Sequence, residues 1–266
     1  MSSVLRVRDE SGVTWFLKRH GDGARYRAEL TAYRKWVAAL GGAAPRLHAA
    51  DDSLQAMILS AAPGEAASWP ATEVTGPAAD RLAERTVQRE AGKILRRLHD
   101  AQSALPWPDF AAVKSEQLDR LKSSAAALLR PRELDRAGAE LTALADVPVP
   151  EQVPCHHDYT PRNWLVGKGA LYVIDFEWCG LDARVADFAR LHLGIWASRP
   201  DLQEAFIDGY GQELSPAEHE ILHGCAVLTA VWLLVKAHET GQPSFEEASR
   251  IALLRMLDRS SSTQHR

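Results

Sequence analysis

The sequence predicts an α+β fold in which a small antiparallel sheet comes first and a largely helical part follows. The first residues alternate between apolar and polar side chains on either side of a hairpin turn signal. Most of the later chain instead repeats its apolar residues at helical spacing. The chain has 266 residues, 46% of them hydrophobic, which suffices for one large domain or two intimate lobes with a real core.

The sheet part is predicted from its strands and turns. Ser11-Gly12 is a hairpin signal, Gly41-Gly42 ends a helical pattern, and Pro63-Gly64 ends the last strand. The predicted elements of this part are strands at 4–8 and 13–18, a helix at 24–40, and strands at 45–48 and 56–60. We therefore expect a first domain at 1–62.

The remaining residues, 63–266, are predicted to form a mostly helical domain. Segment 65–75 has no clear period, and Pro131 interrupts a helical pattern. The predicted elements are helices at 78–101 and 115–144, two short strands at 164–166 and 171–174 around a turn at 167–169, and helices from 186 to the end.

Composition excludes several classes of protein. The net charge of -4 is spread along the chain, so we predict no nucleic-acid partner. The three cysteines are odd in number and far apart, which indicates neither a disulfide framework nor a zinc site. The start of the chain is polar, and the longest apolar run, 225–235, is too short to span a bilayer. We predict a cytoplasmic protein without a membrane partner.

Two short segments carry the chemistry. His156 to Asn163 reads H-H-D-Y-T-P-R-N, and V-I-D-F-E follows at 173–177 after the predicted hairpin. Phosphoryl transfer from a nucleotide needs a carboxylate that orients the attacking hydroxyl, and oxygen ligands that hold Mg²⁺ against the phosphates. Asp158, Asn163 and Asp175 supply this set. Either segment alone arises by chance, but both in this order behind a small sheet are far rarer.

These segments resemble the aminoglycoside phosphotransferase and choline kinase superfamily, whose catalytic loop is H-x-D-x-x-x-x-N and whose metal aspartate begins I-D-[FW]. The resemblance covers most of the chain and implies a protein-kinase-like, two-lobed fold. It implies that Asp158 is the catalytic base, that Asn163 and Asp175 bind Mg²⁺, and that His156 braces the loop. ATP is the implied donor, with GTP open.

The resemblance extends to the nucleotide-binding lobe at 1–62. Lys18 ends an apolar strand, as does the family's lysine that contacts the nucleotide phosphates, and Glu29 in the next helix is its expected partner. Ser60 and Ala62 stand where the adenine would bond to the main chain. An ordinary surface role for the two charges is the alternative.

The first lobe is shorter than the family pattern. Relatives have a strand and a phosphate-covering loop where this sequence has only Met1-Ser2-Ser3, and losing the loop's N–H groups should weaken nucleotide binding. Three explanations are open: a start set too late, a compact but competent lobe, or a drift toward a binding role. The complete set of Asp158, Asn163 and Asp175 argues against the last.

A small-molecule hydroxyl of an antibiotic, an amino alcohol or a sugar is the expected acceptor, and the second domain is expected to bind it. Its candidate contacts are the acids and tryptophans Glu177, Asp182, Asp201, Glu204, Asp208, Glu239, Trp178, Trp196 and Trp232, most of which are otherwise expected to be solvated or core residues. There are two alternatives. One is a peptide Ser/Thr kinase, which the absence of an A-P-E-like segment disfavours. The other is a non-catalytic nucleotide-binding pseudokinase. The acceptor's identity and the oligomeric state stay open.

Overall fold

The computed structural model describes residues 2–67, 78–167 and 169–263. The chain divides into two compact units. Unit 1 comprises Met1–Ala104, Val153–Asp182 and Arg199–Glu213, and unit 2 comprises Leu105–Gln152, Ala183–Ser198 and Leu214–Arg266. The domain boundary expected after residue 62 stays a prediction.

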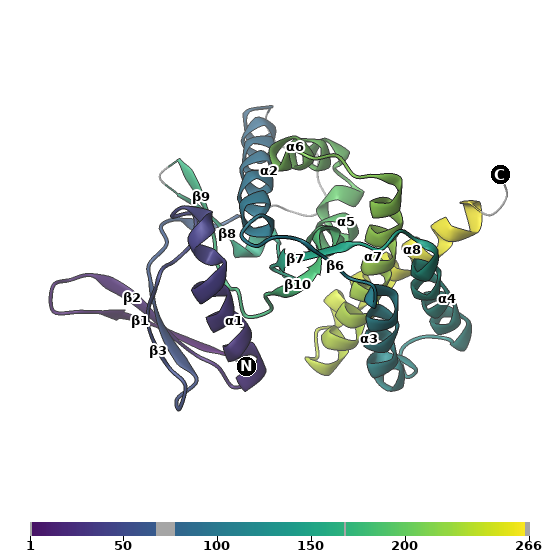
Figure 1. Cartoon of the computed structure of the whole chain (residues 1–266), viewed down its shortest axis with the longest axis horizontal. Helices are drawn as coiled ribbons and strands as arrows, with labels where there is room; N and C mark the ends of the chain where they lie inside the picture. The colour runs from purple at the N-terminus through teal and green to yellow at the C-terminus, as the bar shows by residue number, and fades with distance from the viewer. Residues whose placement is uncertain (1, 68–77, 168, 264–266) are drawn as a thin grey trace. The chain divides into compact units, whose positions relative to one another are not determined.

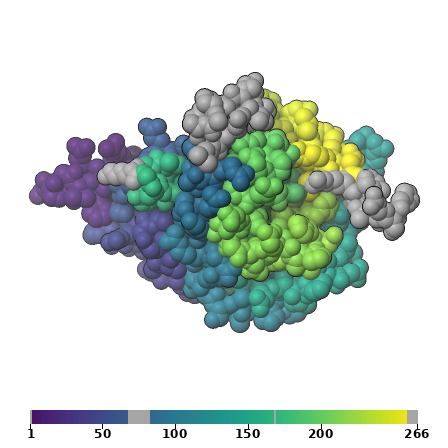
Figure 2. Space-filling view, turned by 90° about the horizontal axis from the view of Figure 1, so that it is seen from above, coloured from purple at the N-terminus to yellow at the C-terminus, as the bar shows by residue number. Residues whose placement is uncertain are grey.

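Unit 1 begins with an antiparallel sheet in the strand order β1-β2-β4-β3 (Figure 1). Its strands are β1 (Ser3–Arg8), β2 (Thr14–Arg19), β3 (Leu47–Asp51) and β4 (Ala56–Ser60). The β1–β2 hairpin is purple in Figure 2, and every residue of β1 is exposed to solvent. Lys18 on the neighbouring β2 is buried and pairs in register with Val4 and Met57.

Helix α1 (Gly23–Lys35) follows the hairpin and presents Glu29 on its buried face. The Asp22 carboxylate accepts a hydrogen bond from the N–H of Ala24 at 2.7 Å and so caps the helix start. The helix ends at Lys35 with Trp36 as its C-cap, and a 3-10 helix (Val37–Leu40) continues the chain. The buried positions recur at helical spacing, namely Tyr26, Glu29, Leu30 and Tyr33.

The other elements of unit 1 hold the two motif segments, 156–163 and 173–177. A second sheet has the order β5-β8-β9, with β8 and β9 as a hairpin. Two helices pack against each other beside it, α2 and α6. Their bounds are β5 (Glu65–Ala66), β8 (Trp164–Gly167), β9 (Ala170–Val173), α2 (Ala78–His99) and α6 (Pro200–Tyr210).

Helices make up most of unit 2, and its other helices pack against the central helix α7 (Pro216–Glu239). The others are α3 (Phe110–Ala125), α4 (Pro131–Thr142), α5 (Ala189–Leu193) and α8 (Pro243–Thr263). By length and composition α7 could cross a membrane, but 72% of its apolar window is buried within the structure, as in the core helix of a globular protein. In the described residues no other helix meets that criterion.

A third sheet has the order β10-β7-β6, and short 3-10 helices link other elements. The strands are β6 (Leu105–Pro106), β7 (Glu151–Cys155) and β10 (Gly180–Ala183). The further 3-10 helices are Ala143–Asp146, Pro161–Asn163, Arg184–Phe188 and Ile195–Ala197.

The predicted α+β order, sheet first and helices after, is confirmed. The helix expected at 24–40 ends early at Lys35, and the one expected at 115–144 is two helices, because Pro131 occupies the first position of α4. The strand expected at 45–48 lies at Leu47–Asp51. Strands β5, β6, β7 and β10 were missed, since they are short and lack clear alternation. Met1, residues 68–75 of the irregular segment and residue 168 of the turn lie outside the described residues.

Candidate active site

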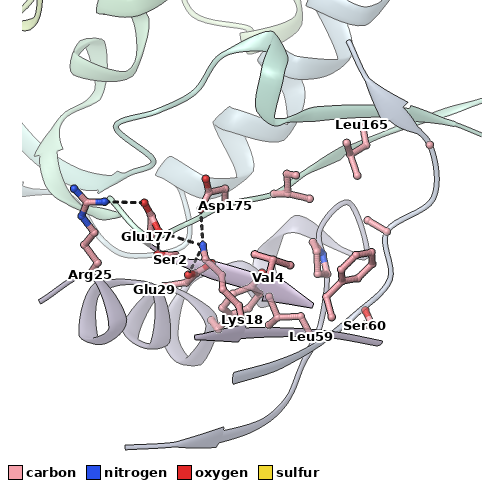
Figure 3. Close-up of a pocket in the computed structure, with 16 residues that line it drawn as sticks. Ser2, Val4, Lys18, Arg25, Glu29, Leu59, Ser60, Leu165, Asp175 and Glu177 are labelled. Atoms are coloured by element: carbon pink, nitrogen blue, oxygen red, sulfur yellow. Dashed lines mark hydrogen bonds and ion pairs between the residues drawn. The ribbon is translucent and has the colours of Figure 1, made fainter. Parts of the chain in front are cut away.

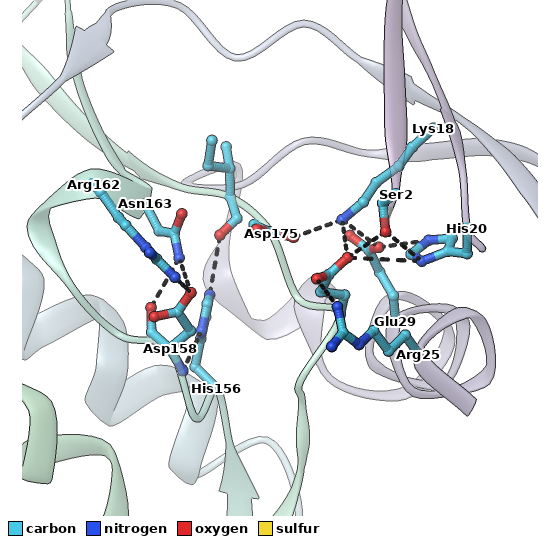
Figure 4. Close-up of polar contacts among 12 residues, drawn as sticks. Ser2, Lys18, His20, Arg25, Glu29, His156, Asp158, Arg162, Asn163 and Asp175 are labelled. Atoms are coloured by element: carbon cyan, nitrogen blue, oxygen red, sulfur yellow. Dashed lines mark hydrogen bonds and ion pairs between the residues drawn. The ribbon is translucent and has the colours of Figure 1, made fainter. Parts of the chain in front are cut away.

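Asp158 lies within the loop 156–163, the predicted catalytic loop, and is almost completely buried, with 2% of its surface exposed. The Asn163 amide Nδ2 donates to the Asp158 carboxylate at 3.0 Å and to its main-chain oxygen at 2.9 Å (Figure 4). The largely exposed Arg162 guanidinium forms an ion pair with the same carboxylate. The five-residue spacing therefore turns the loop back on itself, as the two motif residues require.

Hydrogen bonds join this loop to Ile174, the residue before Asp175. The N–H of Asp158 donates to Nδ1 of His156 at 3.3 Å, so Nε2 carries the ring proton and donates to the Ile174 carbonyl at 3.1 Å. The N–H of Ile174 in turn donates to the Asn163 carbonyl at 3.0 Å. Both main-chain groups of Ile174 thus bond to the loop, which fixes Ile174, the neighbour of Asp175, against it.

Asp175 leaves β9 with a left-handed backbone, at φ 68°. Such a conformation is unfavourable for most residues and is tolerated by Asp and Asn. The next residue, Phe176, is fully buried and packs against the rings of Tyr33, 5.5 Å away, and His156, 5.0 Å away. This anchor leaves the Asp175 side chain 35% exposed, with its Oδ1 directed at Lys18.

Lys18 contacts three carboxylates. Its Nζ lies 2.7 Å from Glu29 Oε2, 2.6 Å from Asp175 Oδ1 and 3.4 Å from Glu177 Oε2. Burial acts to lower the pKa of Lys18, but the negative charges of Glu29 and Asp175 outweigh it and raise that pKa above its ordinary value. Lys18 is therefore a buried, permanently charged cation.

A cavity of about 540 Å³ opens beside Lys18. Figure 3 shows Arg25, Glu177 and Asp175 gathered at one end and Ser60 and Leu165 at the other. The apolar lining is Val4, Phe16, Pro45, Leu59, Leu165 and Ile174, and the polar lining includes Ser2, Lys18, Arg25, Glu29, Asp175 and Glu177. The cavity thus joins an apolar compartment to a charged one.

Ser60 and Ala62 lie on the rim of the apolar end. Ser60 forms two hydrogen bonds with the main chain of Arg46, both at 2.9 Å. The Ser60 N–H donates to the Arg46 carbonyl, and the Arg46 N–H donates to the Ser60 hydroxyl. The N–H of Ala62 has no hydrogen-bond partner among the residues that the structure describes. It is therefore available to a ligand in the cavity.

Gly64 holds this rim against the β8–β9 hairpin. Its φ is +111°, and a Cβ at this position would lie 2.5 Å from the Val166 carbonyl oxygen. Only glycine allows both the backbone angle and this close approach. Ala62 lies two residues earlier in the chain, so we expect this contact to help position it.

The structure brings the sequence-predicted site residues into two linked groups within unit 1. Lys18, Glu29, Ser60, Ala62 and Asp175 line the cavity. Asp158 and Asn163 lie in the loop that is bonded to Ile174, the neighbour of Asp175. Their chemical roles stay predictions.

Sequence reasoning missed four polar or aromatic residues of the cavity and its surroundings: Ser2, His20, Arg25 and Tyr33. Arg25 had a signal, because it precedes Glu29 by four residues and so shares its helix face. His20 had one as well, since it lies two residues after Lys18, just past the strand, where an extended chain directs alternate side chains to the same side. Ser2 and Tyr33 carried no such signal.

The acids expected to meet a cationic acceptor are mostly paired with basic side chains of the chain itself. The pairs are Glu177–Arg25, Asp182–His157, Asp201–Arg199, Asp208–Arg89 and Glu239–Lys236. Trp178 lies under the Arg25 guanidinium, 4.0 Å from it, and Trp196 is buried. The ring of His157 also contacts the Trp178 carbonyl at 2.8 Å.

Residues 2–224 match the phosphotransferase enzyme family. No curated protein matches the sequence. Among solved structures, the chain is similar to a choline/ethanolamine kinase family protein from Mesorhizobium loti, with 18% identity, a TM-score of 0.68 and coverage of 96% of this chain and 86% of that one.

Two further solved structures show the same fold. A thermostable mutant of aminoglycoside phosphotransferase APH(4)-Ia has 14% identity, a TM-score of 0.69 and coverage of 97% and 94%. The macrolide 2'-phosphotransferase MphH from Brachybacterium faecium has 17% identity, a TM-score of 0.62 and coverage of 94% and 87%. They confirm the protein-kinase-like fold.

The family match spans most of the chain, and the matched region contains both the catalytic loop and the Asp175 segment. It confirms the resemblance drawn from the two motifs. The chain belongs to the phosphotransferase enzyme family.

Proposed function

We propose that this protein is an ATP-dependent O-phosphotransferase that moves the γ-phosphoryl group to a hydroxyl of a small molecule. One observation carries the proposal: the loop with Asp158 and Asn163 is bonded through Ile174 to the segment of Asp175, whose carboxylate contacts Lys18 in a cavity. An acid, two oxygen ligands and a cation in this linkage are the parts that phosphoryl transfer requires.

The cavity supports binding of a nucleotide. Its volume of about 540 Å³ lies in the usual range for cofactor sites. The apolar end suits a purine ring, which would bond to the free N–H of Ala62 and the carbonyl of Ser60 at the rim. The charged end suits the phosphates, with Lys18 as their contact. A solved APH(4)-Ia structure with a TM-score of 0.65 contains AMP-PNP and hygromycin B.

The charged end also fits a divalent cation. Among the described residues of the lining, the three carboxylates Glu29, Asp175 and Glu177 face two cations, Lys18 and Arg25. This end therefore carries an excess negative charge that would repel a bare triphosphate. Asn163 donates through Nδ2, which leaves its Oδ1 without a hydrogen-bond partner among the described residues. The free oxygens of Asn163 and Asp175 are ligands that Mg²⁺ prefers. When bound, Mg²⁺ would offset phosphate charge.

In the proposed reaction Asp158 orients the acceptor hydroxyl for in-line attack and accepts its proton. Asn163 holds the Asp158 carboxylate in place through its amide, and Lys18 offsets negative charge on the phosphates. Positioning and electrostatics would supply most of the acceleration.

A small-molecule alcohol remains the proposed acceptor class, whether antibiotic, amino alcohol or sugar. The names of the similar structures include choline/ethanolamine, macrolide and aminoglycoside phosphotransferases. Because most candidate acids of this chain are already paired with its own arginine and lysine side chains, their presence gives no special support to a cationic acceptor.

Calorimetry with Mg·ATP, Mg·GTP and magnesium-free ATP tests the nucleotide step. We expect Mg²⁺-dependent binding of ATP, and GTP is the comparison that defines the donor. A screen of alcohol acceptors for ADP release would follow, with the Asp158→Ala variant as the blank. Absence of binding to either nucleotide would refute the proposal, and turnover that persists in the blank would refute the role of Asp158.

A further inference from the structure

Glu177 contacts residues from three separate segments of the chain, and neither motif assigns it a role. Its Oε2 accepts a hydrogen bond from the Ser2 hydroxyl at 2.7 Å and lies 3.4 Å from Lys18 Nζ. Its Oε1 accepts from Arg25 Nη1 at 3.2 Å. The side chain is only 11% exposed, so these contacts are poorly screened by solvent. One carboxylate therefore links β2, α1 and the residue before β1.

Arg25 fixes the direction of this carboxylate. Its guanidinium lies over the Trp178 ring, 4.0 Å from the ring centroid, and this aromatic contact restricts its movement. Because Arg25 binds Oε1, the other oxygen of Glu177 is directed toward Lys18. Trp178 follows Glu177 directly in the chain, so the arrangement is compact.

Lys18 needs such a partner when the site is in use. Asp175 contacts Lys18 at 2.6 Å, and under the proposed function the same carboxylate binds the metal. If Asp175 held the metal, its carboxylate would be turned away from Lys18, and the buried ammonium would keep only two of its three carboxylate partners. Glu29 remains at 2.7 Å, and Glu177 is the third carboxylate, close enough to take over at 3.4 Å.

We propose that Glu177 is a positioning residue that holds Lys18 at the phosphate end of the cavity once Asp175 binds the metal, and that Arg25 acts through Glu177. This inference rests on the proposed nucleotide site and deepens it. The sequence predicted Glu177 as an acceptor contact, whereas in the structure its side chain lines the proposed nucleotide cavity.

A metal site is the competing interpretation of the same cluster. His20, Glu29 and Glu177 are buried with ligand atoms within 4.8 Å of one another. The Lys18 ammonium, however, already lies between the two carboxylates, 2.7 Å from Glu29 and 3.4 Å from Glu177. A divalent cation there would meet strong repulsion from this charge. The cluster is therefore the counter-charge of Lys18.

Calorimetry on the full chain tests the role of Glu177, with Mg·ATP and adenosine as the two ligands. We expect Glu177→Gln to weaken Mg·ATP binding roughly 10- to 100-fold, the usual effect of a residue that orients a ligand-binding group. Adenosine affinity should not change, since adenosine lacks the phosphates that Lys18 meets. Glu177→Asp, which restores the charge, should recover part of the loss.

Arg25→Gln provides the second arm. If Arg25 acts through Glu177, the double variant Arg25→Gln/Glu177→Gln should bind Mg·ATP no more weakly than Glu177→Gln alone. An additive loss would show that Arg25 meets the phosphates itself and would overturn this part. Glu133→Gln in unit 2 is the matched control, because Glu133 is also a buried glutamate paired with arginines.

The outcomes separate this inference from the proposed function. Wild-type protein that binds no nucleotide overturns both. Wild-type binding with equal Mg·ATP affinity in Glu177→Gln overturns only the inference. Equal losses of Mg·ATP and adenosine affinity, together with a thermal midpoint lower than that of Glu133→Gln, would indicate general damage to the cavity and would also overturn it.

Discussion

Lys18 Nζ donates a hydrogen bond to Asp175 Oδ1 at 2.6 Å, although the two residues lie 157 positions apart. The contact joins strand β2 to the segment after β9, and it places the candidate phosphate-binding cation against the candidate metal ligand. Each charge therefore influences the other, and a change at Asp175 acts on Lys18 as well as on a bound metal.

Replacing Asp175 by Asn should abolish Mg²⁺-dependent binding of ATP. The amide cannot supply the negative charge that a divalent cation needs, and Lys18 loses its 2.6 Å partner. Asn is preferred to Ala because it tolerates the left-handed backbone at φ 68°, so the protein should remain folded. Calorimetry with Mg·ATP measures the effect, and an unchanged affinity would count against the metal role.

Replacing Asp158 by Ala should lower turnover by roughly 10²- to 10⁴-fold, the range typical of a lost acid–base group, while Mg·ATP binding persists. Asp158 does not line the nucleotide cavity, which is the reason to expect this separation. Steady-state ADP release and calorimetry on one preparation give the two readouts. Wild-type turnover in the variant would show that another group orients the acceptor.

Much of the fold was predictable because local patterns agree with it. The alternation in β1 and β2 and the helical period of α2 appear directly in the sequence. Strand β7 was not predictable, since its residues E-Q-V-P-C include Pro154 and do not alternate. Its place in a sheet comes from pairing with distant segments, which a local pattern does not record.

The site divides in the same way. Asp158, Asn163 and Asp175 were recognisable from spacing and order, and the expected Lys18–Glu29 pair is present at 2.7 Å. The contacts of Glu177 were not predictable, because its partners come from positions 2, 18 and 25, and only the tertiary fold brings these together. A motif identifies the residues, whereas the partner of each charge depends on packing.

Glu218 should give unit 2 a measurable dependence on acid. Burial acts to raise its pKa, but the Arg184 guanidinium and the main chain of Ser215 outweigh burial and hold the pKa below its ordinary value of 4.5. A lowered pKa contributes stability above the unfolded-state value and loses it as pH falls through the folded-state value.

The Glu218→Gln variant isolates this charge, because Gln at the third helical position can still complete the cap at Ser215 that begins α7. We expect a loss of about 1 kcal/mol in unfolding free energy at pH 7. The difference from wild type should vanish as the pH falls below 4.5 toward the lowered pKa. Urea unfolding across pH 3 to 7 would check this, and a pH-independent difference would contradict it.

Tyr33→Phe should leave stability unchanged or raise it by up to about 1 kcal/mol. The Tyr33 hydroxyl is buried and has no hydrogen-bond partner among the described residues, and burial raises its pKa well above the ordinary value. Phe keeps the ring contact with Phe176 and removes the unpaired group. A lower thermal midpoint would show that the hydroxyl has a partner, and weaker ATP binding at equal stability would assign that partner to the nucleotide.

Gly64→Ala should destabilise the protein and weaken adenosine binding together. The new Cβ would lie 2.5 Å from the Val166 carbonyl oxygen, and the backbone angle of +111° is itself unfavourable for alanine. Overpacking of this kind costs about 1–3 kcal/mol. Because neither backbone can yield easily, the rim that carries Ala62 should shift, and adenosine should lose its main-chain contact.

Gly12→Ala is the matched control for Gly64→Ala. Gly12 has φ +84° but no atom within 4 Å of the added Cβ, so this variant carries the backbone penalty alone. Equal thermal midpoints and equal adenosine affinities in the two variants would show that the contact with Val166 does not position the rim.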